Sequence, residues 1–104
     1  MTTDPGLRIR RHIEYVAEPT DDYGDILDPA HYPREAAAHK AVPHLFEQWP
    51  DAVLVDVART IRHGSRDGGD CGDYTYEYIR RYYRDGRTVE LTTARGLSPV
   101  EVTA

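Results

Sequence analysis

The chain has 104 residues, a formal net charge of −5 and a single cysteine. This length suits one domain with a modest core, and it excludes a large enzyme with a separate cofactor-binding domain. We expect neither a membrane span nor a secretory signal, because the sequence has no long apolar run and no charged-then-apolar leader. One cysteine cannot form an internal disulfide, so we expect a cytoplasmic protein.

Large aliphatic side chains are scarce, since Leu, Ile, Val and Phe together number only 20. Such a shortage in a charged chain is typical of disorder. Eight tyrosines and one tryptophan argue against disorder, because disordered chains contain few aromatic residues. We therefore predict one folded domain, 1–104, with a core built partly from tyrosine. Its ends, 1–6 and about 97–104, are expected to be loosely ordered.

The first predicted strand covers roughly residues 7–17, where Leu7, Ile9, Ile13 and Tyr15 alternate with polar side chains. Residues 18–33 contain three prolines and a glycine, which predicts a long loop. Long ordered loops are often functional. This loop carries the densest acidic cluster in the chain: Glu18, Asp21, Asp22, Asp25 and Asp28.

An amphipathic helix is predicted over residues 34–49, because its apolar side chains recur at helical spacing. We expect one kinked helix, with Pro43 on the solvent side and Pro50 ending it. The apolar stripe consists of Ala38, Ala41, Val42, Leu45, Phe46 and Trp49.

Three further strands are predicted after the helix, at about 53–62, 73–84 and 87–93, and Val100 and Val102 are spaced as in a short last strand. Asp85-Gly86 is a strong two-residue hairpin signal. The resulting register places Arg81 opposite Glu90. The face of Val89 and Leu91 then becomes the core face, and four tyrosines join it: Tyr74, Tyr76, Tyr78 and Tyr82.

These elements predict an α+β fold in which one kinked amphipathic helix packs on a curved antiparallel sheet, in the order β-α-β-β-β with a possible further strand. By topology alone the order resembles a cystatin-like roll, in which a curved sheet wraps a single helix. No family motif accompanies this resemblance, and a fold does not by itself give a function.

Three arginines share the apolar-face parity of the predicted strands: Arg11, Arg59 and Arg80. A guanidinium keeps its charge on burial, so each must meet an acid, reach water or be displaced. The functional interpretation is a pocket for an anionic ligand, with Tyr78 and Tyr82 beside the arginines. The structural interpretation is a β-bulge near residues 79–80, or arginine stems at the sheet edge. The position of Ile79 on the opposite face favours the bulge.

The segment 63–72 is predicted to be a flexible loop that contains Cys71. Nearby carboxylates disfavour its thiolate, so we expect no nucleophile there. Those acids match no calcium-binding pattern, and His39 and His44 lie five residues apart, on different faces of the helix. We therefore predict no catalytic residue, no metal site and no cofactor. The acids around the cysteine are Asp67, Asp70 and Asp73.

We expect a small non-enzymatic module that binds another protein, as inhibitor, immunity-type and phage or mobile-element accessory proteins do. One expected contact region is the acidic loop, through Asp21, Asp22, Asp25 and Asp28. The other is the exposed side of the hairpin, through Arg81, Tyr83 and Arg84.

Two alternatives stay open. The strand of alternating tyrosine and arginine is typical of nucleic-acid binding, although an acidic chain repels phosphate backbones. The other alternative is a small anionic-ligand pocket or minor enzyme around Arg11, Arg59 and Arg80. A homodimer through an exposed edge strand is also compatible with the sequence.

Overall fold

The computed structural model describes residues 11–63, 73–94 and 98–102. The first half contains β1 (Arg11–Asp21), β2 (Ala30–Tyr32), α1 (Glu35–Lys40) and α2 (Val42–Gln48). The second half contains β3 (Ala52–His63), β4 (Asp73–Tyr83), β5 (Thr88–Thr93) and β6 (Pro99–Glu101). The strands form one antiparallel sheet in the order β2-β1-β3-β4-β5-β6. The predicted α+β class is confirmed.

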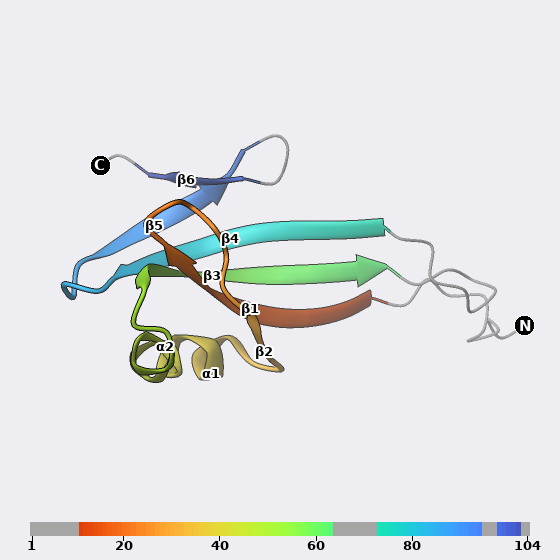
Figure 1. Cartoon of the computed structure of the whole chain (residues 1–104). Helices are drawn as coiled ribbons and strands as arrows, with labels where there is room; N and C mark the ends of the chain where they lie inside the picture. The colour runs from red at the N-terminus through yellow and green to blue at the C-terminus, as the bar shows by residue number, and fades with distance from the viewer. Residues whose placement is uncertain (1–10, 64–72, 95–97, 103–104) are drawn as a thin grey trace, which may run out of the picture.

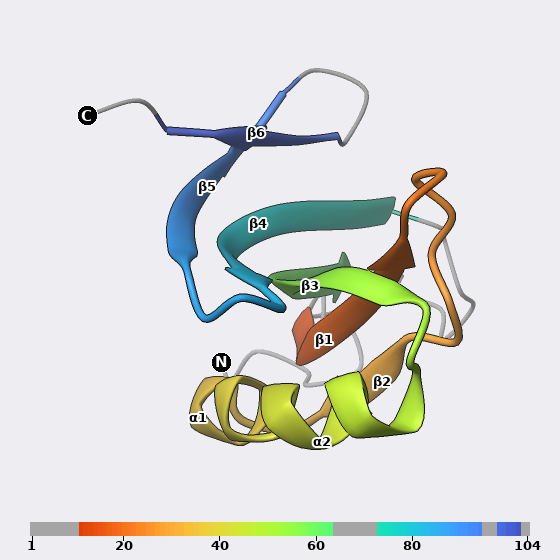
Figure 2. The same cartoon turned by 60° about the vertical axis from the view of Figure 1, so that its left-hand side comes forward.

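The two faces of the sheet are covered differently. Both helices lie against one face, whereas β5 and β6 curl over the other (Figure 1, Figure 2). Under the helices, Val42 and Leu45 pack with Val55 and Val57 in the main hydrophobic core. The opposite face carries a smaller cluster of Val16, Ala58, Tyr78 and Leu91.

The predicted kinked helix is divided in the structure into two short helices that meet at Ala41. Pro43 lacks an N–H, and its ring conflicts with the carbonyl four residues earlier. It is tolerated where it lies, in the first turn of α2. The predicted apolar stripe is confirmed, because Ala38, Val42 and Leu45 are buried and Trp49 packs against the core.

The predicted loop over 18–33 is wrong at both ends. β1 continues to Asp21, and β2 lies within the same segment, at Ala30–Tyr32. Pro19 fits inside β1 because the registered pairs with β2 involve only residues 15–17. A proline lacking an N–H is accepted on such an edge.

The predicted hairpin register is wrong by one residue. Arg80, not Arg81, lies opposite Glu90, and Arg81 lies opposite Val89. Tyr83 donates its backbone N–H to the carbonyl oxygen of Arg87 at 2.8 Å, which leaves a turn of three residues, 84–86. Gly86 in this turn has a φ of +96°, a left-handed conformation that suits glycine. A two-residue loop would have paired Arg84 with Arg87, and the added residue shifts every pair.

The predicted β-bulge is confirmed. Val57 pairs with Arg80 and Ala58 pairs with Tyr78, which leaves Ile79 as the extra residue of β4. Ile79 and Tyr82 pack under the helices, whereas Tyr76 and Tyr78 belong to the cluster on the other face. The tyrosines predicted to share one core face are therefore divided between two, and the side chain of Tyr74 lies outside the described residues.

Candidate functional site

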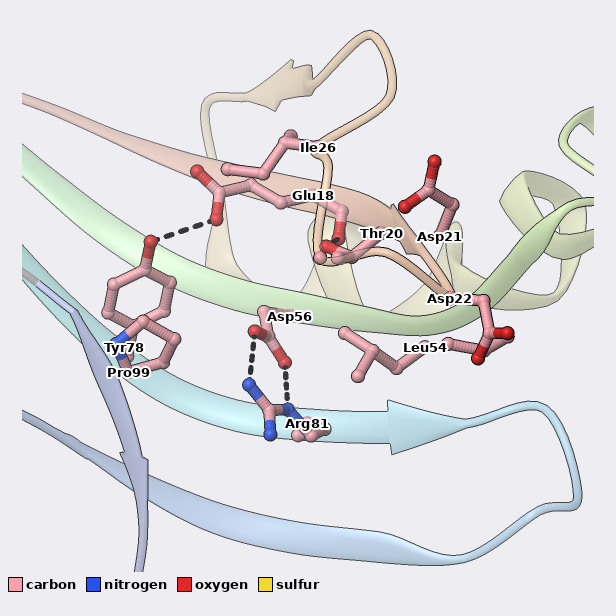
Figure 3. A pocket seen from close by; sticks show the side chains of 12 residues that line it. Glu18, Thr20, Asp21, Asp22, Ile26, Leu54, Asp56, Tyr78, Arg81 and Pro99 are labelled. Atoms are coloured by element: carbon pink, nitrogen blue, oxygen red, sulfur yellow. Dashed lines mark hydrogen bonds and ion pairs between the residues drawn. The ribbon is translucent and has the colours of Figure 1, made fainter.

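A pocket of about 350 Å³ opens on the sheet face opposite the helices (Figure 3). Its volume lies within the range of ligand pockets, roughly 300–1,000 Å³. Glu18 of β1, Asp56 of β3 and Arg81 of β4 line it, and Pro99 of β6 contributes from above the sheet. The segment between β1 and β2 forms another wall, through residues that include Asp22 and Ile26.

Strand alternation brings the polar side chains of the pocket together. Glu18 shares the parity of Val16 and lies opposite Asp56, which in turn lies opposite Arg81. These three residues therefore form one row across β1, β3 and β4, on the face that the helices leave uncovered.

Glu18 is an acid buried by its surroundings, with 5% of its surface exposed. Tyr78 donates its hydroxyl to Glu18 Oε1 at 3.0 Å, and Tyr76 donates to Oε2. Burial raises the pKa of Glu18, and the two hydroxyl hydrogen bonds oppose that rise because they favour the carboxylate. Burial also raises the pKa of Tyr78, which keeps this hydroxyl protonated as a donor.

Asp56 is 3% exposed and has a cationic partner. Arg81 donates from Nε to Asp56 Oδ1 at 2.8 Å and from Nη2 to Oδ2 at 2.9 Å, a bidentate pair. Arg81 also donates to Glu101 of β6 at 3.1 Å, and Tyr83 donates its hydroxyl to the same carboxylate. Arg81 thus links three strands, and its charge is shared between two acids.

The acids of the predicted contact loop have different roles. Asp21 accepts hydrogen bonds from the backbone N–H groups of Tyr23 and Asp25, both at 2.9 Å, and so shapes the turn. Asp21 and Asp22 line the pocket, whereas Asp25 and Asp28 are exposed outside it.

Two arginines of the predicted anion pocket, Arg59 and Arg80, are each paired with an acid. Arg59 donates from Nε to Glu77 at 2.8 Å, and Arg80 donates to Glu90 at 2.6 Å. Both lie in register with helix-side residues, Arg59 with Tyr15 and Arg80 with Val57. The side chain of Arg11 lies outside the described residues.

The two tyrosines assigned to that anion pocket face opposite ways. Tyr78 lines the pocket of Glu18, whereas the Tyr82 hydroxyl lies 2.6 Å from His39 Nδ1, on the helix side. His39 Nε2 lies 3.1 Å from Glu35, which joins α1 to β4 through three side chains.

Arg84, predicted to contact a partner, holds the hairpin against the end of α2. It donates to the carbonyl oxygens of Ala52 and Trp49, both at 2.8 Å, and its guanidinium lies 4.8 Å from the centre of the Phe46 ring. These N–H donors of Arg84 are therefore engaged within the protein, in the way that cationic side chains commonly bind the last carbonyls of a helix. The predictions for Cys71, Asp67 and Asp70 concern positions outside the described residues, and the side chain of Asp73 is also outside them.

The sequence pattern did not predict that Glu18 is buried, nor that Asp56 lies opposite it on β3. The parity signal was present, because Glu14, Val16 and Glu18 alternate with Tyr15 and Ala17. Ending the strand at residue 17, before Pro19, concealed it.

Comparison with protein-family models, with curated proteins and with solved structures finds no match to the chain. Among the residues that the structure describes, no helix has both the length and the apolar character needed to cross a membrane. The function is therefore argued from the geometry of the pocket.

Proposed function

We propose that the chain is a small non-enzymatic module that binds another protein through the pocket face. The supporting observation is the pocket itself, which combines buried acids at its base with exposed apolar side chains near its opening. Of the residues that line the pocket, Ile26 is 50% exposed and Val53 is 37% exposed. Apolar side chains beside polar groups are typical of protein interfaces.

The proposal keeps part of the contact surface expected from sequence and discards the rest. Asp21, Asp22 and Arg81 belong to the pocket, and Tyr83 is joined to it through Glu101. Arg84 has an internal role instead. Inhibitor, immunity-type and accessory proteins are the classes that this size and charge suit.

The test is co-purification of the full chain with proteins of its source organism, using one variant at the pocket rim and one outside it. Asp22→Lys reverses a charge on the pocket wall, and Asp28→Lys makes the same change outside the pocket. We expect the wild type and Asp28→Lys to retain the same partner, and Asp22→Lys to lose it. Retention by Asp22→Lys as strong as by Asp28→Lys would contradict the choice of this face.

A second candidate, a small-ligand pocket or minor enzyme, is favoured by the environment of Glu18. An acid with a raised pKa that borders a pocket is suited to general acid catalysis. The expected centre of such a ligand site is therefore Glu18, and no longer Arg59 and Arg80, which are paired with acids. It predicts that a small molecule raises the thermal unfolding temperature of the isolated chain, and a screen of metabolites in which none does so counts against it.

Nucleic-acid binding through the Tyr/Arg strand has less support. Arg80 is bound to Glu90, Arg81 to Asp56, and Arg84 to main-chain carbonyls. Guanidinium groups engaged in this way are poorly placed to neutralise phosphates.

A further inference from the structure

We infer that the partner anchors itself by inserting an arginine or lysine side chain into the pocket, beside Glu18. This inference rests on the proposed function and names the chemistry of the contact. Among its described lining residues, Arg81 is the one cationic side chain of the pocket. Four carboxylates line it: Glu18, Asp21, Asp22 and Asp56.

Among the residues that the structure describes, Glu18 has hydroxyl partners and the nearby His31, but no arginine or lysine partner. Its two carboxylate oxygens accept from the neutral hydroxyls of Tyr76 and Tyr78. In the part of the chain that the structure describes, no lysine or arginine forms an ion pair with it. A buried carboxylate without a cation is unfavourable, so a cation that enters the pocket gains the attraction without first breaking an existing pair.

Arg81 does not supply that missing charge. Its guanidinium donates to both oxygens of Asp56 and to Glu101. The two acids in the row across β1, β3 and β4 therefore differ in their partners. Asp56 is paired with the positive charge of Arg81, whereas Glu18 accepts a hydrogen bond from the neutral hydroxyl of Tyr78 (Figure 3).

The walls of the pocket suit the stem of a long cationic side chain. Ile26, Leu54 and Pro99 contribute apolar surface to the lining of the pocket. Lysine and arginine combine an aliphatic stem with a charged head, so the stem can pack on these walls while the head reaches Glu18. Asp22 at the exposed rim favours the approach of the same charge.

A bare metal ion fits this site less well than a side chain. Among residues 11–63, 73–94 and 98–102, no three His, Cys, Asp or Glu side chains are grouped closely enough to hold one. Hard cations need several converging oxygen ligands, whereas a guanidinium or ammonium needs one carboxylate and an apolar wall.

Nuclear magnetic resonance titration of the full wild-type chain tests the inference with two matched probes. N-acetyl-arginine amide carries the cation, and N-acetyl-citrulline amide has nearly the same shape without the charge. We expect the arginine probe to shift the backbone amide signals of Glu18, Ile26 and Asp56, and to bind about tenfold more tightly than the citrulline probe. Equal affinities, or no shifts at these amides with either probe, would overturn the inference.

Two variants locate the charge that the probe recognises. Glu18→Gln keeps the shape of the side chain and should reduce the arginine preference to about one, because the anionic partner is gone. Glu47→Gln removes the same charge from an exposed position on α2 and should leave the preference unchanged. If Glu18→Gln fails to fold, the exposed Asp22→Asn takes its place, with an expected loss of about two- to threefold. An arginine preference that survives both substitutions contradicts the inference.

The outcome is separable from that of the proposed function. If the co-purified partner needs Asp22 but the two probes bind equally, the protein-binding proposal stands and the cationic anchor is wrong. If the arginine probe is preferred but Asp22→Lys retains the partner, the pocket binds cations and the proposed contact face is wrong.

Discussion

The two faces of the central sheet differ in what covers them and in what they bury. Under α1 and α2 the sheet buries Val55 and Val57 against Leu45, an apolar contact with no ionic group at its centre. On the other face the same strands bury Glu18 and Asp56 beneath β6. Neighbouring residues of one strand therefore serve opposite purposes, since Val55 and Val57 stabilise the fold and Asp56 between them belongs to the pocket.

The helix-side face of the sheet supplies most of the apolar burial, and the opposite face carries the buried acids Glu18 and Asp56. Burial of an apolar layer stabilises the folded state, whereas a buried ion pair stabilises it little more than apolar side chains of similar size would. The proposed binding function gives Glu18 and Asp56 a role that a gain in stability does not.

The largest effect should come from shortening the helix-side core. Leu45→Ala removes a side chain that is 3% exposed and should lower the free energy of unfolding by about 2–5 kcal/mol. Leu91→Ala is the matched change on the other face, and it should lie at the low end of that range because β5 and β6 can settle into the space. Urea denaturation measures both, and an equal or larger loss for Leu91→Ala would break the comparison.

The next effect concerns ion pairs. Asp56→Asn weakens the buried bidentate pair with Arg81 and should lower the free energy of unfolding by about 3 kcal/mol. Glu90→Gln weakens the exposed pair with Arg80 and should change it by no more than about 1 kcal/mol. The same urea experiment separates them, and similar losses would mean that burial does not distinguish the two pairs.

Arg84 offers a test of the hairpin as a structural element. Arg84→Ala removes the donors to Ala52 and Trp49 and should lower the free energy of unfolding by about 1–3 kcal/mol. The control is Arg87→Ala, whose exposed guanidinium lies 3.9 Å from Asp85 and should matter little to stability. Partner binding should be retained by Arg84→Ala at temperatures where it is folded, and its selective loss would return this residue to the contact surface.

The smallest effect is a dependence of stability on pH. The pKa of Glu18 is raised in the folded chain, so the folded state holds this proton more tightly than the unfolded state. The stabilisation is complete below the ordinary value of 4.5 and is lost as pH rises through the raised pKa. Charged or titratable groups facing this acid come from three strands: His31 on β2, Asp56 on β3, and Tyr76, Tyr78 and Arg81 on β4.

Urea midpoints measured from pH 4.5 to pH 8 check this effect. Glu18→Gln should flatten the decline, and Glu47→Gln should leave it as in the wild type. A wild-type decline that persists in Glu18→Gln would assign the titration to another group.

Periodicity predicted the parts of the fold that depend on one element at a time. The helical stripe through Leu45, the β-bulge at Ile79 and the short last strand all follow from local patterns. The pairing between strands was harder to predict, because one additional residue in the β4–β5 loop places Glu90 opposite Arg80 instead of Arg81, and Val89 opposite Arg81.

The row of polar side chains in the pocket depends on the pairing of β3 with β1 and with β4, which the sequence pattern did not predict. Arg81 could be assigned to Asp56 only with the correct register, and Glu18 only with a strand that runs through Pro19. Proline within a strand is rare except at edges, so the pattern pointed to a loop. The acidic cluster was visible in the sequence, and two of its expected contact residues, Asp21 and Asp22, line the pocket.

Hydrogen exchange of the chain bound to its co-purified partner tests the central claim most directly. If the partner binds the pocket face, exchange should slow on binding in residues 18–26, 54–56 and 99–101 and should stay unchanged in α1 and α2. Slower exchange concentrated in residues 35–48, with the pocket face unaffected, would contradict it and would place the binding surface on the helices.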